Sequence, residues 1–144
     1  MTQTNRILLV FITVLLAACK STPAPTPAVQ VVGQQVSVPG GTYTDVSAAE
    51  LQTMLANKDF TFVNVHIPFE GDIANTDLSI PYDQIGQNLK KLPADKNARI
   101  VLYCRSGRMS SIAAKTLVSQ GYTNVWNLAG GMVGWEQAGL PIKR

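Results

Sequence analysis

A cysteine between an apolar segment and a helix-like segment is the residue in this sequence best placed for chemistry. Cys104 follows the apolar run 100–103 and precedes the short loop 105–109, Arg-Ser-Gly-Arg-Met. From Ser110 onward apolar residues recur at helical spacing, which makes Ser110 the predicted N-cap of a helix. Loop N–H groups, the helix dipole and two arginines all stabilise negative charge, so this position favours the nucleophilic thiolate.

Alternating strand-like and helix-like segments must position this loop. Their short links predict an α/β fold, a central parallel sheet with helices on both faces. In such sheets a site lies beyond the carboxyl ends of the strands, where the Cys104 loop falls. The expected helices are 48–57, started by the capping box Ser47–Glu50, then 85–92, 110–120 and 132–138; the expected strands are 60–66, 99–103 and 125–128.

The N-terminal segment has the composition of a signal peptide. One cation, Arg6, precedes the apolar run 7–18. A helix of this length rises about 18 Å, short of the roughly 30 Å hydrocarbon core, so residues 1–18 are expected to be cleaved rather than to span a membrane. The sequence Leu-Ala-Ala-Cys ending at Cys19 resembles a bacterial lipobox, which implies lipidation of Cys19. The alternative is an ordinary signal sequence with a chance cysteine.

The predicted lipidation sets the expected location. Lys20 is not the aspartate-type residue that retains lipoproteins at the inner membrane. The expectation is therefore a bacterial cell-envelope protein, held through Cys19 at the outer membrane and facing the periplasm.

Residues 19–41 are expected to be a tether that follows the lipidated N-terminus. Prolines at 23, 25 and 27 alternate with Ala and Thr, a composition typical of extended, semi-rigid chain. The remaining residues, 42–144, have the size of one domain. This part holds ten of the twelve Lys and Arg residues and all nine Asp and Glu residues, so its charge is nearly balanced. No nucleic-acid partner is expected, because no basic run supports one.

The two cysteines of the chain have separate explanations. With Cys19 lipidated, Cys104 is the one unmodified thiol of an exported protein, and no internal disulfide is available. Such a thiol is either buried and inert or kept for reactivity, and the loop around Cys104 favours reactivity. The sole histidine, His66, excludes a metal site that needs two histidines, and no metal or cofactor is expected.

Three segments together resemble the C-terminal half of a single-domain rhodanese. They are residues 100–110 with the cysteine loop, 121–132 with the Gly130-Gly131 pair, and 135–141. The resemblance implies a rhodanese-like fold and a sulfurtransferase. Such an enzyme takes a sulfane sulfur from thiosulfate or a similar donor, carries it as a cysteine persulfide, and passes it to a thiol or cyanide. A thiol of a periplasmic protein is also a possible acceptor under this resemblance.

The resemblance implies roles for the residues of the loop. Cys104 is the nucleophile, and the loop from Arg105 to Met109 with Gly107 forms the cradle of the persulfide. The candidates to hold an anionic donor are Arg105 and Arg108. Ser106 is a candidate hydroxyl donor.

The N-terminal half departs from the family pattern. Where rhodaneses have Asp-Val-Arg, this sequence has Asn64-Val65-His66, so the usual aspartate–arginine ion pair is absent. Asn64 and His66 are expected to supply a neutral structural substitute, and altered donor specificity is the alternative. His66 at a strand end leaves a Cys–His pair with Cys104 open beside a purely structural role. An acidic loop, formed by Glu70, Asp72 and Asp77, either lines the pocket or is solvated surface.

Three other functions compete with sulfur transfer. Cysteine phosphatases share the strand–loop–helix arrangement, but they carry an arginine six positions after the cysteine, where this chain has Ser110. The shorter loop suits a sulfur atom better than a phosphoryl group. A non-catalytic rhodanese module that docks a partner has no need for the cysteine, arginines and glycine in one loop. A disulfide oxidoreductase lacks the second cysteine of its motif.

Overall fold

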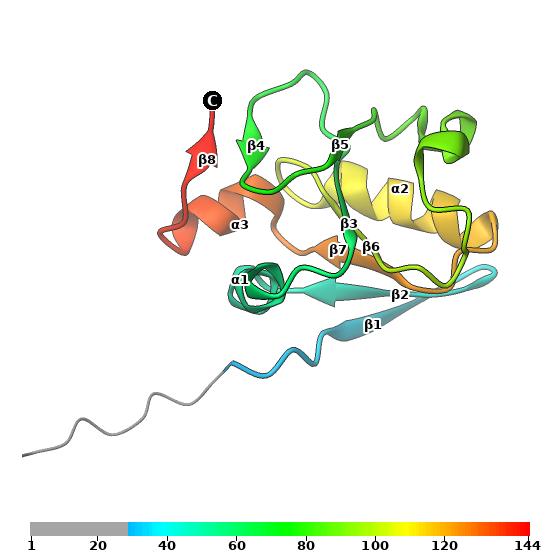
Figure 1. The fold of residues 1–144 in the computed structure, drawn as a ribbon, viewed down its shortest axis with the longest axis horizontal. Helices are drawn as coiled ribbons and strands as arrows, with labels where there is room; N and C mark the ends of the chain where they lie inside the picture. Colours follow the sequence, from blue (N-terminus) through cyan, green and yellow to red (C-terminus); the bar gives the residue numbers. More distant parts are fainter. Residues whose placement is uncertain (1–28) are drawn as a thin grey trace, which may run out of the picture.

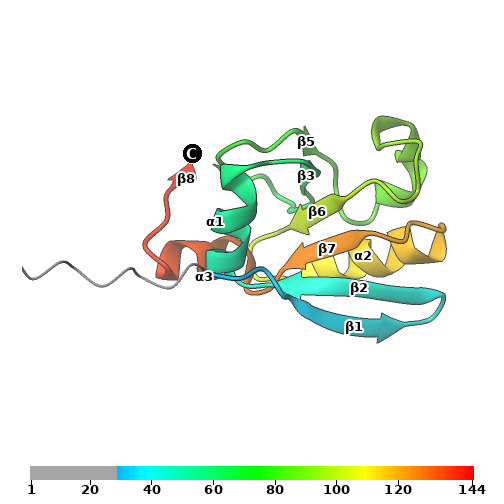
Figure 2. The same cartoon turned by 60° about the horizontal axis from the view of Figure 1, so that its bottom comes forward.

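A six-stranded sheet organises the protein, whose structure, a computed structural model, describes residues 29–144 (Figure 1). The predicted signal peptide, Cys19 and the first part of the tether lie outside the described residues. Strands run in the order β1-β2-β7-β6-β3-β5, and Figure 2 shows them from β1 at the lower edge to β5 at the top. The pairs from β2 to β5 are parallel, which confirms the predicted parallel sheet; β1 alone is antiparallel.

The three predicted strands and three of the four predicted helices are present, whereas β1, β2, β4, β5 and β8 were not predicted. In the large sheet the strands are β1 Gln34–Val38, β2 Gly41–Val46, β3 Thr61–Asn64, β5 Leu78–Ser79, β6 Ile100–Tyr103 and β7 Val125–Leu128. A small antiparallel pair joins β4 Asp72–Ile73 to β8 Ile142–Lys143. The helices are α1 Ala48–Ala56, α2 Arg108–Ser119 and α3 Gly131–Gln137, with the 3-10 turns η1 Ile85–Gln87 and η2 Leu89–Lys91.

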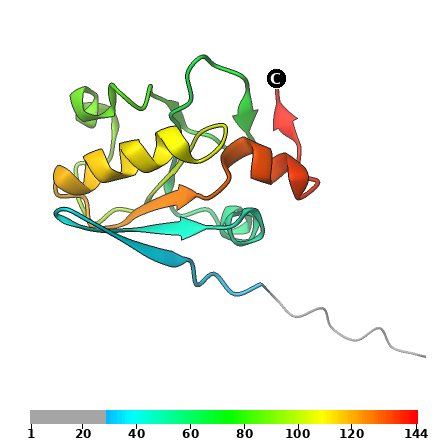
Figure 3. The same ribbon diagram turned by 180° about the vertical axis from the view of Figure 1, so that it is seen from behind.

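Helices cover both faces of the sheet, as predicted. Along β6 the side chains alternate between two apolar clusters. Ile100 and Leu102 pack with Leu117 of α2, whereas Val101 and Tyr103 pack with residues of α1 and α3 such as Leu51. Burial of apolar surface on each face, about 25 cal/mol per Å², fixes the sheet between its helices. The α2 face lies toward the viewer in Figure 3.

The structured domain begins before residue 42, where the sequence analysis placed the end of the tether. β1 pairs with β2 over its whole length, from Gln34 opposite Asp45 to Val38 opposite Gly41. Gly40, at φ +93°, makes the turn between them. The predicted boundary therefore falls inside a β-hairpin, and residues 34–41 belong to the fold.

Glu50 ties the start of this hairpin to α1. The predicted capping box is present, with Glu50 accepting from the Ser47 N–H at 2.8 Å. The same carboxylate accepts from the Gly33 N–H at 2.9 Å and the Val32 N–H at 3.1 Å. These backbone hydrogen bonds, first those from Ser47 and Gly33, lower the pKa of Glu50 to about 2.

The helix predicted over 85–92 is instead a pair of single 3-10 turns. Asn88 ends η1 and starts η2 with φ −110° and ψ 22°, outside the helical region. Gly86 and Asn88 both have weak helix propensity. Gly86 also packs directly against α2, since a Cβ there would lie 3.3 Å from a methyl group of Thr116. Among residues 29–144, no helix has the length and apolar character needed to cross a membrane.

Candidate functional site

Cys104 lies at the carboxyl edge of the sheet, directly after β6, where the sequence predicted it. Two backbone hydrogen bonds fasten this stretch to α3: the Met132 N–H donates to the Cys104 carbonyl and the Val133 N–H to the Arg105 carbonyl, both at 2.9 Å. Figure 3 shows the start of α2 beside the start of α3. Gly131 permits this approach, because a Cβ there would lie 2.4 Å from the Cys104 carbonyl oxygen.

Two hydrogen-bond donors face the sulfur of Cys104. The Gly107 N–H lies 3.1 Å from Sγ and the Ser110 hydroxyl lies 3.4 Å from it. The side chain is only 1% exposed, so the sulfur sits at the base of the loop. Donors aimed at this sulfur stabilise a thiolate, and water competes little for them here.

The loop is shorter and α2 longer than predicted. Gly107, in the left-handed conformation at φ 90°, is the N-cap of α2, and the helix begins at Arg108 rather than after Ser110. The Gly107 carbonyl accepts from the Ser111 N–H at 3.0 Å. Ser110 therefore lies in the first turn, where its hydroxyl faces both the sulfur and the Gly107 carbonyl.

Ser110 is the site residue that the sequence analysis did not assign. It is fully buried, and its hydroxyl also contacts the Gly107 carbonyl at 3.2 Å. Its position in the sequence could have identified it, because a tight loop of this length brings the residue six places after Cys104 back beside the sulfur. The pattern of a polar residue before an apolar run, however, is also that of an N-cap.

The predicted loop residues point in different directions. Arg105 donates to the Glu70 carboxylate at 2.5 Å. Arg108 is exposed and has no ion-pair partner within the part of the chain that the structure describes. Ser106 is exposed, and no hydrogen bond of its hydroxyl is found among residues 29–144. Met109 packs its half-buried side chain against the core under α2.

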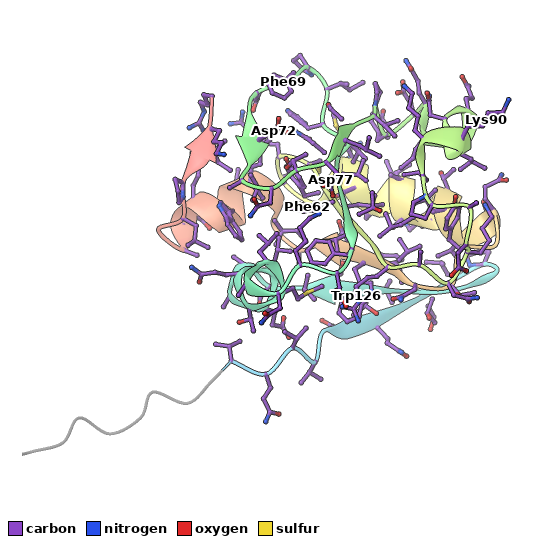
Figure 4. The ribbon with its side chains drawn as sticks, viewed as in Figure 1. Phe62, Phe69, Asp72, Asp77, Lys90 and Trp126 are labelled. Carbon is purple, nitrogen blue, oxygen red and sulfur yellow. The ribbon has the colours of Figure 1, made fainter. Side chains whose placement is uncertain are left out.

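Glu70 joins the loop between β3 and β4 to the cysteine loop. Figure 4 shows its neighbour Phe69 on the outer side of that loop, and Asp72 where the loop enters β4. The hydrogen bond from Arg105 and its positive charge lower the pKa of Glu70, and His66 contributes in the same direction. Glu70 is therefore ionised at neutral pH, and its ion pair with Arg105 is intact there.

His66 stands behind Glu70 and forms no pair with Cys104. Its side chain is 7% exposed, and Nε2 lies 3.5 Å from Oε2 of Glu70. That distance allows attraction when the ring is protonated, but the geometry makes no hydrogen bond, and both ring nitrogens are buried without a partner in the described chain. The Cys–His arrangement left open by the sequence is not formed.

Asn64 has the contacts of a structural residue. Its side-chain amide donates to the Gly71 carbonyl and to Asp72, both at 2.9 Å, and its oxygen accepts from the His66 N–H at 3.0 Å. His66 takes part through its backbone only. Asp72 also accepts from the Tyr103 hydroxyl at 2.9 Å, so this carboxylate holds β4 against the sheet.

The three carboxylates of the acidic loop do not form one cluster but have separate contacts. Asp77 accepts from the Phe62 N–H at 2.7 Å and pairs with Lys58, so it closes the loop onto β3. Glu70 lines a hollow near the start of α3. This hollow, called here the α3 hollow, has a volume of about 50 Å³ and is lined by Glu70, Arg105, Met132, Val133, Glu136 and Arg144. Residues 29–144 contain no group of three His, Cys, Asp or Glu side chains placed to hold a metal ion.

Comparison with known proteins gives one consistent assignment. The sequence model of the rhodanese-like domain matches residues 47–138. A sulfurtransferase from Allochromatium vinosum is 35% identical over 102 residues, which cover 68% of this chain and 92% of that protein. The solved structure of a rhodanese-related protein from Thermoplasma volcanium is 31% identical with a TM-score of 0.58, covering 68% of this chain and 95% of the other.

A second kind of relative is much longer than this chain. The tRNA uridine(34) hydroxylase of Escherichia coli is 28% identical over 108 residues, and the match spans only 31% of its length. The likeness therefore concerns one domain of that protein.

Proposed function

The chain belongs to the rhodanese-like domain family, and we propose that it is a sulfurtransferase in which Cys104 carries the transferred sulfur. The proposed donor is thiosulfate or a similar sulfane compound, and the proposed acceptor is a thiol or cyanide. A periplasmic protein thiol is one form that the acceptor can take.

The proposed reaction has two displacement steps at sulfur. The Cys104 thiolate attacks the outer sulfur of thiosulfate, the S–S bond of the donor breaks, and sulfite leaves with the electron pair. Cys104 then carries a persulfide. An acceptor thiolate or cyanide attacks the outer sulfur of that persulfide and Cys104 leaves as a thiolate, so the protein returns to its starting state.

The observation that supports this proposal most is the pair of donors on the Cys104 sulfur. The Gly107 N–H and the Ser110 hydroxyl both face an atom that is almost fully buried. A purely structural cysteine in an apolar core needs no such donors. Both displacement steps place negative charge on this sulfur or on the sulfur attached to it, and pre-positioned donors lower the free energy of such states.

The test is direct detection of the persulfide. Purified protein is incubated with thiosulfate, and intact-mass spectrometry is used to look for one added sulfur that cyanide removes as thiocyanate. The wild type is expected to gain the sulfur, and Cys104→Ser is expected not to. An unmodified wild type after incubation with thiosulfate and with an organic persulfide would contradict the proposal and favour the docking module.

We also propose that the protein is attached to a membrane through Cys19. The support is the lipobox-like sequence before Cys19 and the proline-rich residues that follow. Detergent phase separation of cells that express the full chain tests this proposal. Wild type is expected in the detergent phase and Cys19→Ala in the aqueous phase, and equal partitioning of the two would refute the anchor. Fractionation of inner and outer membranes tests the proposed outer-membrane location facing the periplasm.

A further inference from the structure

The two arginines of the cysteine loop stand in different electrostatic situations. Arg105 donates to Glu70 at 2.5 Å, whereas Arg108 is exposed with no ion-pair partner in residues 29–144. Sequence reasoning treated the two as equivalent candidates for an anionic donor. Of these two arginines, Arg108 is the one whose positive charge no carboxylate of residues 29–144 offsets.

Arg105 is also directed away from the sulfur. Cys104 packs in the apolar cluster under α2, on one side of the sheet. Arg105 lines the α3 hollow with Met132 and Val133, which belong to the helix on the other side. Successive side chains alternate between the two apolar clusters along β6, and the different surroundings of Cys104 and Arg105 continue that alternation as the strand ends.

Glu70 holds Arg105 in that position. The carboxylate lies between the Arg105 guanidinium and the buried ring of His66, whose Nε2 is 3.5 Å away. The loop that carries Glu70 is itself fixed, because Asn64 donates to the Gly71 carbonyl and β4 pairs with β8. The ion pair is thus set in place by surrounding structure, which reduces the entropy that an exposed pair usually loses on forming.

We infer that Glu70 determines donor specificity: it occupies Arg105 and leaves Arg108 as the cation that recognises an anionic sulfur donor. This inference rests on the proposed sulfur transfer. The site then offers one unpaired positive charge at the loop instead of two. A donor that depends on two cations, such as a compact dianion, is bound less tightly than the loop sequence suggests.

The inference predicts opposite effects for removing the carboxylate and removing the arginines. Thiosulfate binding is measured by calorimetry in the Cys104→Ser background, where no sulfur is transferred. Glu70→Gln is expected to tighten binding about three- to tenfold, because a freed guanidinium adds a charge-assisted contact. Arg108→Ala is expected to weaken binding about tenfold, and Arg105→Ala less than twofold.

A double variant and a matched control separate this effect from a general change in charge. Glu70→Gln combined with Arg105→Ala is expected to lose the gain, since the gain requires the freed arginine. Glu136→Gln removes a carboxylate from the same hollow, one that pairs with Arg144 instead, and is expected to change binding less than twofold. The gain in Glu70→Gln should also shrink at high ionic strength.

The outcomes distinguish this inference from the proposed function. Tighter binding by Glu70→Gln without persulfide formation in the Cys104 protein would support the inference and reject the sulfur transfer. Persulfide formation with unchanged or weaker binding by a folded Glu70→Gln protein would overturn the inference alone. Equal losses in Arg105→Ala and Arg108→Ala would overturn it as well, because both arginines would then contact the donor. Urea unfolding of each variant establishes that the protein is folded.

Discussion

The hydroxyl of Ser110 donates to the sulfur of Cys104, six residues earlier in the chain, at 3.4 Å. Cys104 directly follows β6 and Ser110 lies in the first turn of α2, and the tight loop between them brings the two side chains together. The helix that closes the loop thus supplies a side-chain donor in addition to the Gly107 N–H.

Removing this hydroxyl should make Cys104 a weaker nucleophile. Ser110→Ala is expected to slow both alkylation of Cys104 by iodoacetamide at pH 7 and persulfide formation by about three- to tenfold, since one of two donors to the sulfur is lost. Ser111→Ala is the control, because the Ser111 hydroxyl donates to the Arg108 carbonyl on the exposed side of α2. Equal alkylation rates in Ser110→Ala and wild type would show that the contact does not activate the sulfur.

Gly131 should tolerate no side chain, because it lies against the cysteine loop. Gly131→Ala places a Cβ 2.4 Å from the Cys104 carbonyl oxygen, at φ +56°. The expected loss is more than about 3 kcal/mol of unfolding free energy, from overpacking and backbone strain together. Gly139→Ala is the matched control, since its φ is +79° but no atom lies within 4 Å. Urea unfolding should show a loss of about 1 kcal/mol there, from strain alone. Similar losses in the two variants would mean that the close approach to the loop is unimportant.

Glu50 should make the free energy of unfolding depend on pH. Its pKa in the folded protein, about 2, lies below the ordinary value of 4.5, so folding favours the ionised carboxylate. The stabilisation is present above pH 4.5 and is lost as the pH falls from there through about 2. Glu50→Gln is expected to reduce the unfolding free energy at pH 7 by about 1–2 kcal/mol, since hydrogen bonds to a charged acceptor are stronger than those to an amide.

Urea unfolding at pH 7 and pH 2.5 checks the sign for Glu50. The difference between wild type and Glu50→Gln should be largest at pH 7 and should shrink at the lower pH. Glu136→Gln provides the control, because its single exposed ion pair with Arg144 contributes little at either pH. A difference that grows on acidification would contradict the assignment.

His66 should be replaceable by an apolar ring. Both ring nitrogens are buried without a hydrogen-bond partner in the described residues, a situation that costs folding free energy. His66→Phe is therefore expected to unfold at the same urea concentration as wild type or a higher one, whereas His66→Ala should lose about 2 kcal/mol by leaving a cavity. A loss in His66→Phe as large as that in His66→Ala would reveal a polar contact of the ring.

The sequence predicted the parts of the fold that depend on local pattern. The strands β3, β6 and β7 are largely buried on both faces, and α1 carries a complete capping box, so these elements were readable from local pattern. β1 was missed although Val36 and Val38 alternate with Ser37, because it follows a proline-rich segment and its side chains are only half-buried. The η1–η2 region was misread because apolar spacing alone does not distinguish a helix from two tight turns.

The sequence predicted those features of the site that follow from a residue's position in the chain. It did not predict those that follow from tertiary contacts. Cys104 and Gly107 follow from their place after a strand. The Arg105–Glu70 ion pair joins residues 35 positions apart, and no local pattern shows which of two nearby arginines it engages. The orientation of Met109 into the core likewise depends on α2 beginning at Arg108.

The antiparallel course of β1 decides from which edge the preceding chain reaches the domain. Gln34 lies opposite Asp45, near the carboxyl end of β2, and Gly33 is hydrogen-bonded to Glu50 at the start of α1. The carboxyl end of β6, which lies parallel to β2 with β7 between them, leads into Cys104, so the chain before β1 enters at the edge of the sheet that carries the reactive sulfur (Figure 2). A bulky group joined directly before residue 29 is therefore expected at the same edge of the sheet as Cys104, whereas a dye on Arg144 lies beside the α3 hollow. Shortening an N-terminal linker should restrict bulky acceptors before small ones.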